Sequence, residues 1–243
     1  MTTSSKPLYE RSGHSTARGK ILKMETIPIR EKYELEVMPI TIGGKKLELY
    51  VIRNWDIFVK NLAEQGEEYV KKFPFWVKIW EASIVLTDHL IRIGLEKEKQ
   101  ILEVGAGMGL TGLFLGAFGH EVTITDYEGD ALELLRMNVA RNGLNNVSVR
   151  KLDWNNPDLT ERYDIICGSE LVYNETSIEP IINLFRNYLQ PEGTVFLSHD
   201  SLRKSMIKFI QMVPDRFEIK NMAKTLRGND ELHKIVIHIL RLK

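Results

Sequence analysis

The sequence predicts an α/β fold with a mostly parallel sheet, because apolar strand-like runs alternate with helix-like segments from residue 100 onward. The expected strands cover residues 100–104, 121–126, 147–152, 163–168 and 193–198. The expected helices between them cover about 109–119, 129–142 and 176–189. A glycine-rich turn follows the first strand and a carboxylate ends the second, as in a nucleotide-type cofactor site.

The last part of the chain departs from this alternation. After an expected helix over residues 202–212, two strand-like runs at 216–222 and 232–240 are separated by a turn-forming segment at 228–230. Two strands joined in this way predict an antiparallel edge of the sheet.

The residues before the sheet predict a hairpin and two helices. Residues 33–53 alternate in apolarity around Gly43 and Gly44, which is typical of a β-hairpin. We expect a helix capped by Asn54 over residues 55–72 and another over 82–93. The expected organisation is a flexible polar tail at 1–23, a hairpin and helix extension at 24–75, and the main domain at 76–243.

Composition excludes several classes of protein. Lys and Arg together number 33, as do Asp and Glu, so the 243-residue chain has no net charge that would attract nucleic acid or an anionic membrane. Cys167 is the single cysteine, which excludes an intrachain disulfide and a multi-cysteine metal site. The six histidines are scattered, and we expect no metal. No apolar run is long enough for a membrane span or a secretion signal, so we expect a cytoplasmic protein.

The glycine-rich turn favours S-adenosylmethionine over NAD. Gly107, Gly109 and Gly112 match the dinucleotide fingerprint, but Gly105 already makes the turn directly after Glu103. A carboxylate at this position would repel a pyrophosphate and suits a cationic ligand. S-adenosylmethionine carries a sulfonium and an ammonium group and no phosphate. A role of Glu103 as an ion-pair partner within the protein is the alternative.

Other polar and aromatic residues follow the later strands, at the same carboxyl edge of the sheet. Asp126 is expected to bind the ribose hydroxyls, and Asp153 and Trp154 the adenine amine and ring. Ser169 is expected to line the cleft. A helix cap for Asp126, edge packing for Trp154 and a structural role for Asp153 are the alternatives.

Five segments, at residues 79–86, 102–112, 122–126, 152–154 and 168–173, resemble the seven-β-strand methyltransferases of methyltransferase family 16. That group includes many protein-lysine methyltransferases. The similarity is good over residues 76–200. It implies a Rossmann-like seven-stranded sheet with an antiparallel C-terminal edge strand, and S-adenosylmethionine as the cofactor. By this resemblance the cofactor pocket is lined by Trp80, Gly105, Ala106, Gly107, Asp126, Trp154 and Ser169.

The family motif after the fourth strand is Asp-x-x-Tyr, and this chain has Glu170 in place of the aspartate and retains Tyr173. An acceptor lysine must lose a proton before it can attack the methyl group, from an ordinary pKa near 10.4. We expect Glu170 to hold the incoming ammonium and Tyr173 to orient the amine. The alternative is that Tyr173 only packs and Glu170 caps the next segment. His199 and Asp200 follow the fifth strand, where we expect a surface loop near the cleft, with contact to the substrate as the alternative.

The sequence thus predicts a methyltransferase that acts on a nitrogen, with a protein lysine as the preferred acceptor. A small amine is the alternative acceptor. An NAD-dependent oxidoreductase and a non-catalytic scaffold with the same fold are the alternatives of other classes. The oligomeric state is not predicted.

Overall fold

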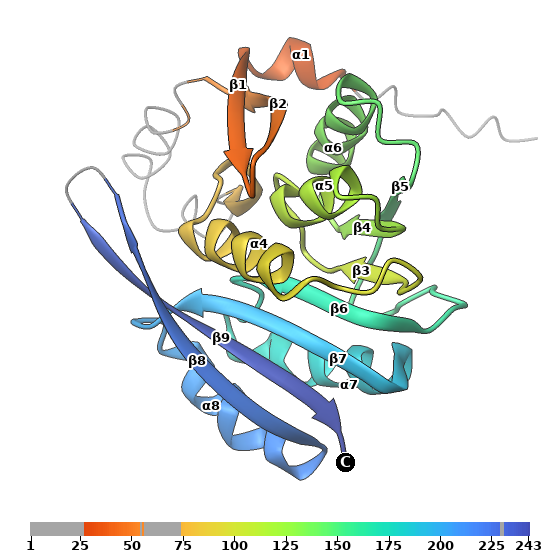
Figure 1. The fold of residues 1–243 in the computed structure, drawn as a ribbon, viewed down its shortest axis with the longest axis vertical. Helices are drawn as coiled ribbons and strands as arrows, with labels where there is room; N and C mark the ends of the chain where they lie inside the picture. The colour runs from red at the N-terminus through yellow and green to blue at the C-terminus, as the bar shows by residue number, and fades with distance from the viewer. Residues whose placement is uncertain (1–26, 54, 56–73, 229–230) are drawn as a thin grey trace, which may run out of the picture.

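The computed structural model describes residues 27–53, 55, 74–228 and 231–243. A seven-stranded sheet of order β5-β4-β3-β6-β7-β9-β8 forms its centre (Figure 1). The first five strands in this order are mutually parallel, and β9 is antiparallel to both its neighbours. The predicted α/β fold is therefore confirmed. The strands are β3 (Ile101–Glu103), β4 (Val122–Asp126), β5 (Val147–Lys151), β6 (Tyr163–Ser169), β7 (Leu189–Asp200), β8 (Phe217–Arg227) and β9 (Leu232–Leu242).

Helices cover both faces of this sheet (Figure 1). Alternate strand residues point to opposite faces, so neighbouring residues such as Ile101 and Leu102 belong to two separate hydrophobic cores. The first core contains side chains of α4 (Glu81–Ile93), α5 (Leu110–Ala117) and α6 (Gly129–Arg141). The second contains those of α7 (Ile178–Tyr188) and α8 (Ser205–Met212).

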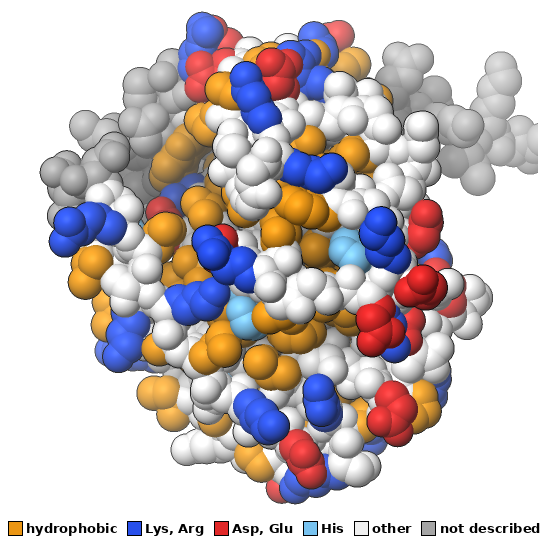
Figure 2. All heavy atoms as spheres, in the orientation of Figure 1, with side chains coloured by type: hydrophobic (Ala, Val, Ile, Leu, Met, Phe, Trp, Pro, Cys, Tyr) orange, Lys and Arg blue, Asp and Glu red, His pale blue; other side chains and the backbone are white. Residues whose placement is uncertain are grey.

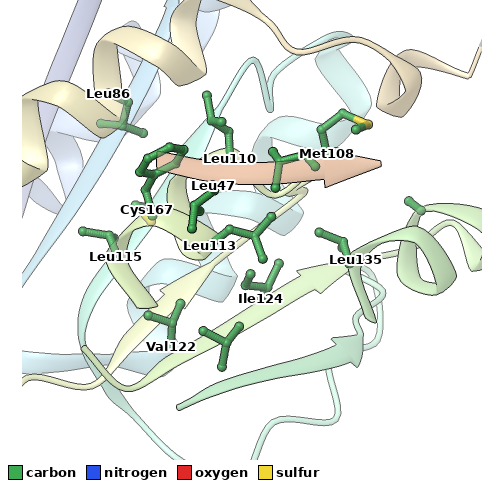
Figure 3. Packing of buried hydrophobic residues seen from close by; sticks show 14 of the residues in the cluster. Leu47, Leu86, Met108, Leu110, Leu113, Leu115, Val122, Ile124, Leu135 and Cys167 are labelled. Atoms are coloured by element: carbon green, nitrogen blue, oxygen red, sulfur yellow. The ribbon is translucent and has the colours of Figure 1, made fainter. Parts of the chain in front are cut away.

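The predicted hairpin is confirmed as β1 (Leu35–Ile42) and β2 (Lys45–Ile52), which form a separate two-stranded sheet. Its turn needs Gly43 and Gly44, whose φ angles are 59° and 81°. Leu47 of β2 lies in the first core beside α5 (Figure 3). The hairpin therefore packs against the layer of helices on one face of the main sheet.

Two asparagines, one in α6 and one at its C-cap, hold the edge of β2. The Asn138 side chain accepts a hydrogen bond from Tyr50 N at 2.7 Å and donates one to Tyr50 O at 3.2 Å. One helical turn later, Asn142 makes the same pair of bonds to Glu48, at 3.0 and 2.9 Å. These amides take the place of a neighbouring strand and satisfy backbone groups that would otherwise be unpaired.

Two strands, β7 and β8, differ from their predicted bounds by four residues or more at one end. β7 begins four residues earlier than expected, because Tyr163 pairs with Leu189 and Ile165 with Thr194. Residues 190–193 form a bulge opposite one residue of β6, which accommodates a proline that cannot donate to the ladder. β8 extends to Arg227, and it is the outermost strand, so the antiparallel C-terminal strand β9 lies one position inside the edge.

The expected tail at 1–23 and the helix at 55–72 lie outside the described residues, apart from Trp55. None of the helices in the described part of the chain is long and apolar enough to cross a membrane. Among the described residues there are also four short elements: α1 (Ile29–Lys32) and the 3-10 turns η1 (Phe75–Val77), η2 (Glu175–Ser177) and η3 (Val213–Asp215).

Candidate functional site

The turn after β3 depends on glycine. Gly105, Gly107 and Gly109 all have left-handed backbones, with φ of 58°, 54° and 69°. A Cβ on Gly105 would lie 2.7 Å from Leu171 Cδ2, and one on Gly107 would lie 3.3 Å from Trp76 Cα. Only glycine allows this turn to pass so close to its neighbours.

Asp126 ties this turn to the end of β4. Its side chain is buried, with 7% of the residue exposed, and its two oxygens accept from Gly107 N at 2.8 Å and Glu128 N at 2.9 Å. Ala106 N donates to Thr125 O at 2.9 Å beside it. Burial raises the pKa of the Asp126 carboxyl. Since a carboxylate can accept about four hydrogen bonds, Asp126 has capacity left for a ribose hydroxyl.

Glu103 has a partner within the protein. Its carboxylate is almost fully buried and accepts from Gly112 N at 2.9 Å, in the first turn of α5, where backbone N–H groups are unpaired. Burial raises the pKa of this carboxyl to about 8, so it is largely protonated at neutral pH. This placement favours the alternative of a role within the protein, and direct contact with a cationic ligand stays a prediction.

Four aromatic rings lie in a row at the carboxyl edge, which we call the aromatic cluster. Tyr173 is at its centre, stacked on Phe75 at 6.2 Å between ring centroids and tilted against Trp154 at 6.1 Å. Phe75 contacts Trp80 at 6.4 Å, and the Trp80 indole N–H donates to Phe75 O at 2.9 Å. The structure thus brings three predicted residues together. It adds Phe75, which was not predicted from the sequence to belong to the site.

A lysine ammonium already lies against one end of this cluster. Lys78 Nζ is 4.8 Å from the centroid of the Trp80 ring and 5.7 Å from that of Trp55. Its charge is paired with Glu81 Oε1 at 2.9 Å. The contact shows that a ring of the cluster can bind an alkylammonium through its face.

Glu170 is held by the protein on both sides. Its backbone has a φ of 56°, the one positive value for a non-glycine residue in the described part of the chain. Its Oε1 accepts from Asp200 N at 2.7 Å, and its Oε2 is ion-paired with Arg203. Burial raises the pKa of this carboxyl, and Arg203 opposes the increase. Glu170 therefore joins the loop after β6 to the loop after β7.

Two further predicted residues, Ser169 and Asp153, make hydrogen bonds within the protein. Ser169 Oγ lies 2.8 Å from Ser198 Oγ on the neighbouring strand, and Ser198 Oγ donates to Ala82 O at 2.9 Å. Asp153 accepts from Asn155 N at 2.9 Å and so supports its own turn. That contact favours the structural alternative for Asp153, whereas Ser169 lies at the sheet edge beside Glu170.

The sequence suggested that His199 lies in a surface loop, and this prediction is wrong. His199 is a buried residue of β7, and its Nε2 is 2.7 Å from Nε2 of the equally buried His238 on β9. His238 Nδ1 lies 2.6 Å from Asn221 Oδ1 on β8. The strand continues beyond its predicted end because these imidazoles find partners inside the sheet. Burial lowers the pKa of both, that of His238 to about 4.

Known proteins that are similar to this chain are named as methyltransferases, in agreement with the predicted S-adenosylmethionine site. The profile of a family described as lysine methyltransferase matches residues 67–216. Protein N-lysine methyltransferase METTL21A of Xenopus tropicalis is 31% identical over 171 residues, covering 68% of this chain and 79% of that protein. Histidine protein methyltransferase 1 homolog of Dictyostelium discoideum is 33% identical over 172 residues, covering 65% of this chain but only 56% of that protein.

Solved structures show the same fold at lower identity. The crystal structure of ribosomal protein L11 methylase from Lactobacillus delbrueckii subsp. bulgaricus superposes with a TM-score of 0.55 at 21% identity. The match covers 68% of this chain and 81% of that one.

Proposed function

We propose that this chain, which belongs to the lysine methyltransferase family, transfers a methyl group from S-adenosylmethionine to the side-chain amine of a lysine in a protein. The observation that carries the proposal is the half-exposed Phe75–Tyr173 ring pair beside the glycine turn and Asp126. The cofactor elements and a surface suited to an ammonium thus meet at one sheet edge.

The residues at the turn fit S-adenosylmethionine. Asp126 offers a carboxylate for the ribose diol, the turn of Gly105, Ala106 and Gly107 has no side chain larger than methyl, and Trp154 offers an indole face. When bound, the cofactor supplies an electrophilic methyl group on a sulfonium. Gly112 N, in the first turn of α5, already donates to the Glu103 carboxyl and is not available to a pyrophosphate at this helix N-terminus, which argues against the oxidoreductase alternative.

The aromatic cluster would prepare the acceptor. Phe75 and Tyr173 are 47% and 52% exposed, so a side chain that enters from solvent can reach both rings. Aromatic faces attract the ammonium, while partial desolvation lowers the pKa of the amine and favours loss of its proton to water. Burial raises the pKa of the Tyr173 phenol, which keeps it neutral and able to orient the amine.

Glu170 acts in this proposal as a positioning residue. Its carboxylate is already occupied by Asp200 N, at the last residue of β7, and by Arg203, in the loop that follows. It would therefore place Tyr173, three residues later, rather than bind the ammonium itself.

The test is calorimetric titration with S-adenosylmethionine and S-adenosylhomocysteine, with NAD as the negative control. We expect both sulfur ligands to bind, and Asp126→Ala and the more conservative Asp126→Asn to weaken binding. Circular dichroism of both variants separates lost contacts from lost folding. A folded wild-type protein that binds neither sulfur ligand would contradict the assignment and favour the scaffold alternative.

The acceptor needs a second measurement, because one relative is named as a histidine methyltransferase. Protein extract is incubated with the enzyme and methyl-labelled cofactor, hydrolysed and analysed for methylated amino acids. Label in methyl-lysine supports the proposal, and label in methyl-histidine replaces it with that second candidate. Label only in small molecules favours the amine alternative.

A cytoplasmic location is also part of the proposal. It rests on the composition, with one buried cysteine and no net charge. Microscopy of the tagged chain in its native cells tests it.

A further inference from the structure

Two highly exposed leucines line one groove next to the aromatic cluster. Leu202 is 85% exposed and Leu232 is 67% exposed, the highest values among the large hydrophobic side chains of the described residues. Together with Tyr173 they line a groove of about 630 Å³, which we call the leucine groove. Apolar side chains exposed to this extent contribute little to folding, and it is their position together in one groove, rather than their exposure alone, that indicates a surface for a partner.

Hydrogen bonds connect the segments that line the leucine groove. Ser201 N donates to Lys234 O at 2.8 Å, which joins the loop after β7 to β9. The Ser205 hydroxyl donates to Val172 O, the residue before Tyr173. These bonds hold the two leucines and Tyr173 in a fixed relation, because they connect all three segments that carry them.

The charges around the groove favour a protein over a nucleic acid. Asp200 and Glu231 line it together with Arg203, Lys204 and His233, so both signs are present. The Arg203 charge is paired with Glu170. A phosphate backbone needs a surplus of unpaired cations, which this groove does not offer. Figure 2 shows one face of the molecule as a whole, on which Lys and Arg side chains are interspersed with apolar side chains.

We propose that the leucine groove binds the segment of the acceptor protein that flanks the methylated residue, with an apolar side chain of that segment between Leu202 and Leu232. This inference rests on the proposed function. Its occupant follows from continuity, since Tyr173 belongs to both the groove and the aromatic cluster. A segment whose acceptor residue reaches Tyr173 must pass directly beside the two leucines.

The test compares the double variant Leu202→Ser/Leu232→Ser with the control Ile207→Ser. Ile207 is 64% exposed on α8, next to this loop, but does not line the groove. The probe is the protein band that the wild-type enzyme labels most strongly in a soluble extract supplied with methyl-labelled cofactor. We expect the double variant to raise the KM for this band about tenfold or more, because burial of one leucine contributes about 1.5–3 kcal/mol. The control should leave KM unchanged, and S-adenosylhomocysteine affinity and thermal midpoint should stay at wild-type values in both.

Three outcomes would overturn the inference. Equal KM for the double variant and wild type would show that the leucines do not contact the acceptor. A wild-type dimer that the double variant converts to monomer, seen by sedimentation, would assign the groove to a second copy of the chain. A wild-type enzyme that binds S-adenosylhomocysteine but labels no protein would reject the protein acceptor itself, which is a failure of the proposed function and is recognisable as such.

Discussion

Glu170 combines a backbone conformation that non-glycine residues seldom adopt with a buried carboxylate. Such a conformation persists only where surrounding contacts over-determine it, and here Arg203 and Asp200 N supply them. The conformation turns the chain sharply after β6, so that Tyr173 lies between Phe75 and Trp154. We therefore expect Glu170 to determine the position of the Tyr173 side chain.

A double-mutant cycle tests this positioning role. We expect Glu170→Gln and Arg203→Gln each to lower kcat about tenfold, and the double variant to be no worse than either, because both remove the same ion pair. S-adenosylhomocysteine affinity should not change. If Glu170 instead binds the acceptor ammonium, Glu170→Gln alone would act mainly on KM, and the effect of Arg203→Gln would be small and additive. Tyr173→Phe provides the reference for loss of the hydroxyl alone.

Glu103 should make stability depend on pH. Burial raises its pKa to about 8 in the folded protein, against an ordinary value near 4.5. The folded state therefore holds a proton that the unfolded state releases, and the free energy of unfolding falls by about 1.4 kcal/mol per pH unit between about pH 5 and 8. Glu103→Gln removes this ionisation and keeps an acceptor for Gly112 N.

Denaturant unfolding at several pH values measures this effect as the difference between variant and wild type. The advantage of Glu103→Gln should be small near pH 5 and grow toward pH 8. Glu121→Gln, at an exposed position, serves as the control for the loss of one glutamate charge. A difference for Glu103→Gln that does not change with pH would mean that the buried carboxyl ionises normally.

Residue types at the sheet edge were predictable from the sequence, but their partners were not. Trp80, Trp154 and Tyr173 were each assigned to the site, and the structure brings them together. Phe75 was missed because no periodicity or spacing distinguishes a ring of the site from a packing ring. The ion pair of Glu170 joins residues 33 positions apart, a distance over which a single sequence carries no signal.

Elements were predictable where apolar periodicity was strong. The parallel strands and the hairpin follow from it, since each buries one or both faces. The start of β7 was placed too late because proline and glycine near residue 191 usually end an element, whereas here they form a bulge. His199 was taken for a loop residue because a lone imidazole gives no indication of a partner such as His238.

The packing of α5 against the sheet gives a prediction at the scale of a single helix. A Cβ on Gly112 would lie 2.5 Å from Ile124 Cγ1 and 2.6 Å from Glu103 Oε2. Gly112→Ala should therefore lower the free energy of unfolding by about 1–3 kcal/mol, despite the better helix propensity of alanine.

Gly129→Ala is the matched control for this change. It lies at the first position of α6, and an added Cβ there meets nothing within 4 Å. We expect it to raise stability by up to about 1 kcal/mol. Chemical denaturation of both variants gives the comparison, and equal effects at the two sites would show that α5 can shift away from the sheet.

At the scale of the whole molecule, the hairpin and the main sheet share one hydrophobic core. Leu47 and Leu49 of β2 belong to the same buried cluster as Ile124 of β4 and Leu135 of α6 (Figure 3). The sequence suggested a boundary between an extension and a main domain near residue 75, because the hairpin pattern stops before the alternating segments begin. A core that crosses this boundary favours one cooperative folding unit over two.

Asn138 provides the means to test that cooperativity. Its side chain is fully buried and makes two hydrogen bonds to the backbone of Tyr50, so Asn138→Ala leaves two polar groups unpaired. We expect a loss of about 2–3 kcal/mol in the free energy of unfolding. Asn142→Ala breaks the equivalent bonds to Glu48 at an exposed position, where water replaces them, and should cost about 1 kcal/mol or less.

The number of unfolding transitions tests the cooperativity itself. Both variants should unfold in a single transition, with tryptophan fluorescence and circular dichroism coinciding, because Trp76 belongs to the shared core. Separation of the two signals in Asn138→Ala would instead show a hairpin that detaches while the main sheet stays folded.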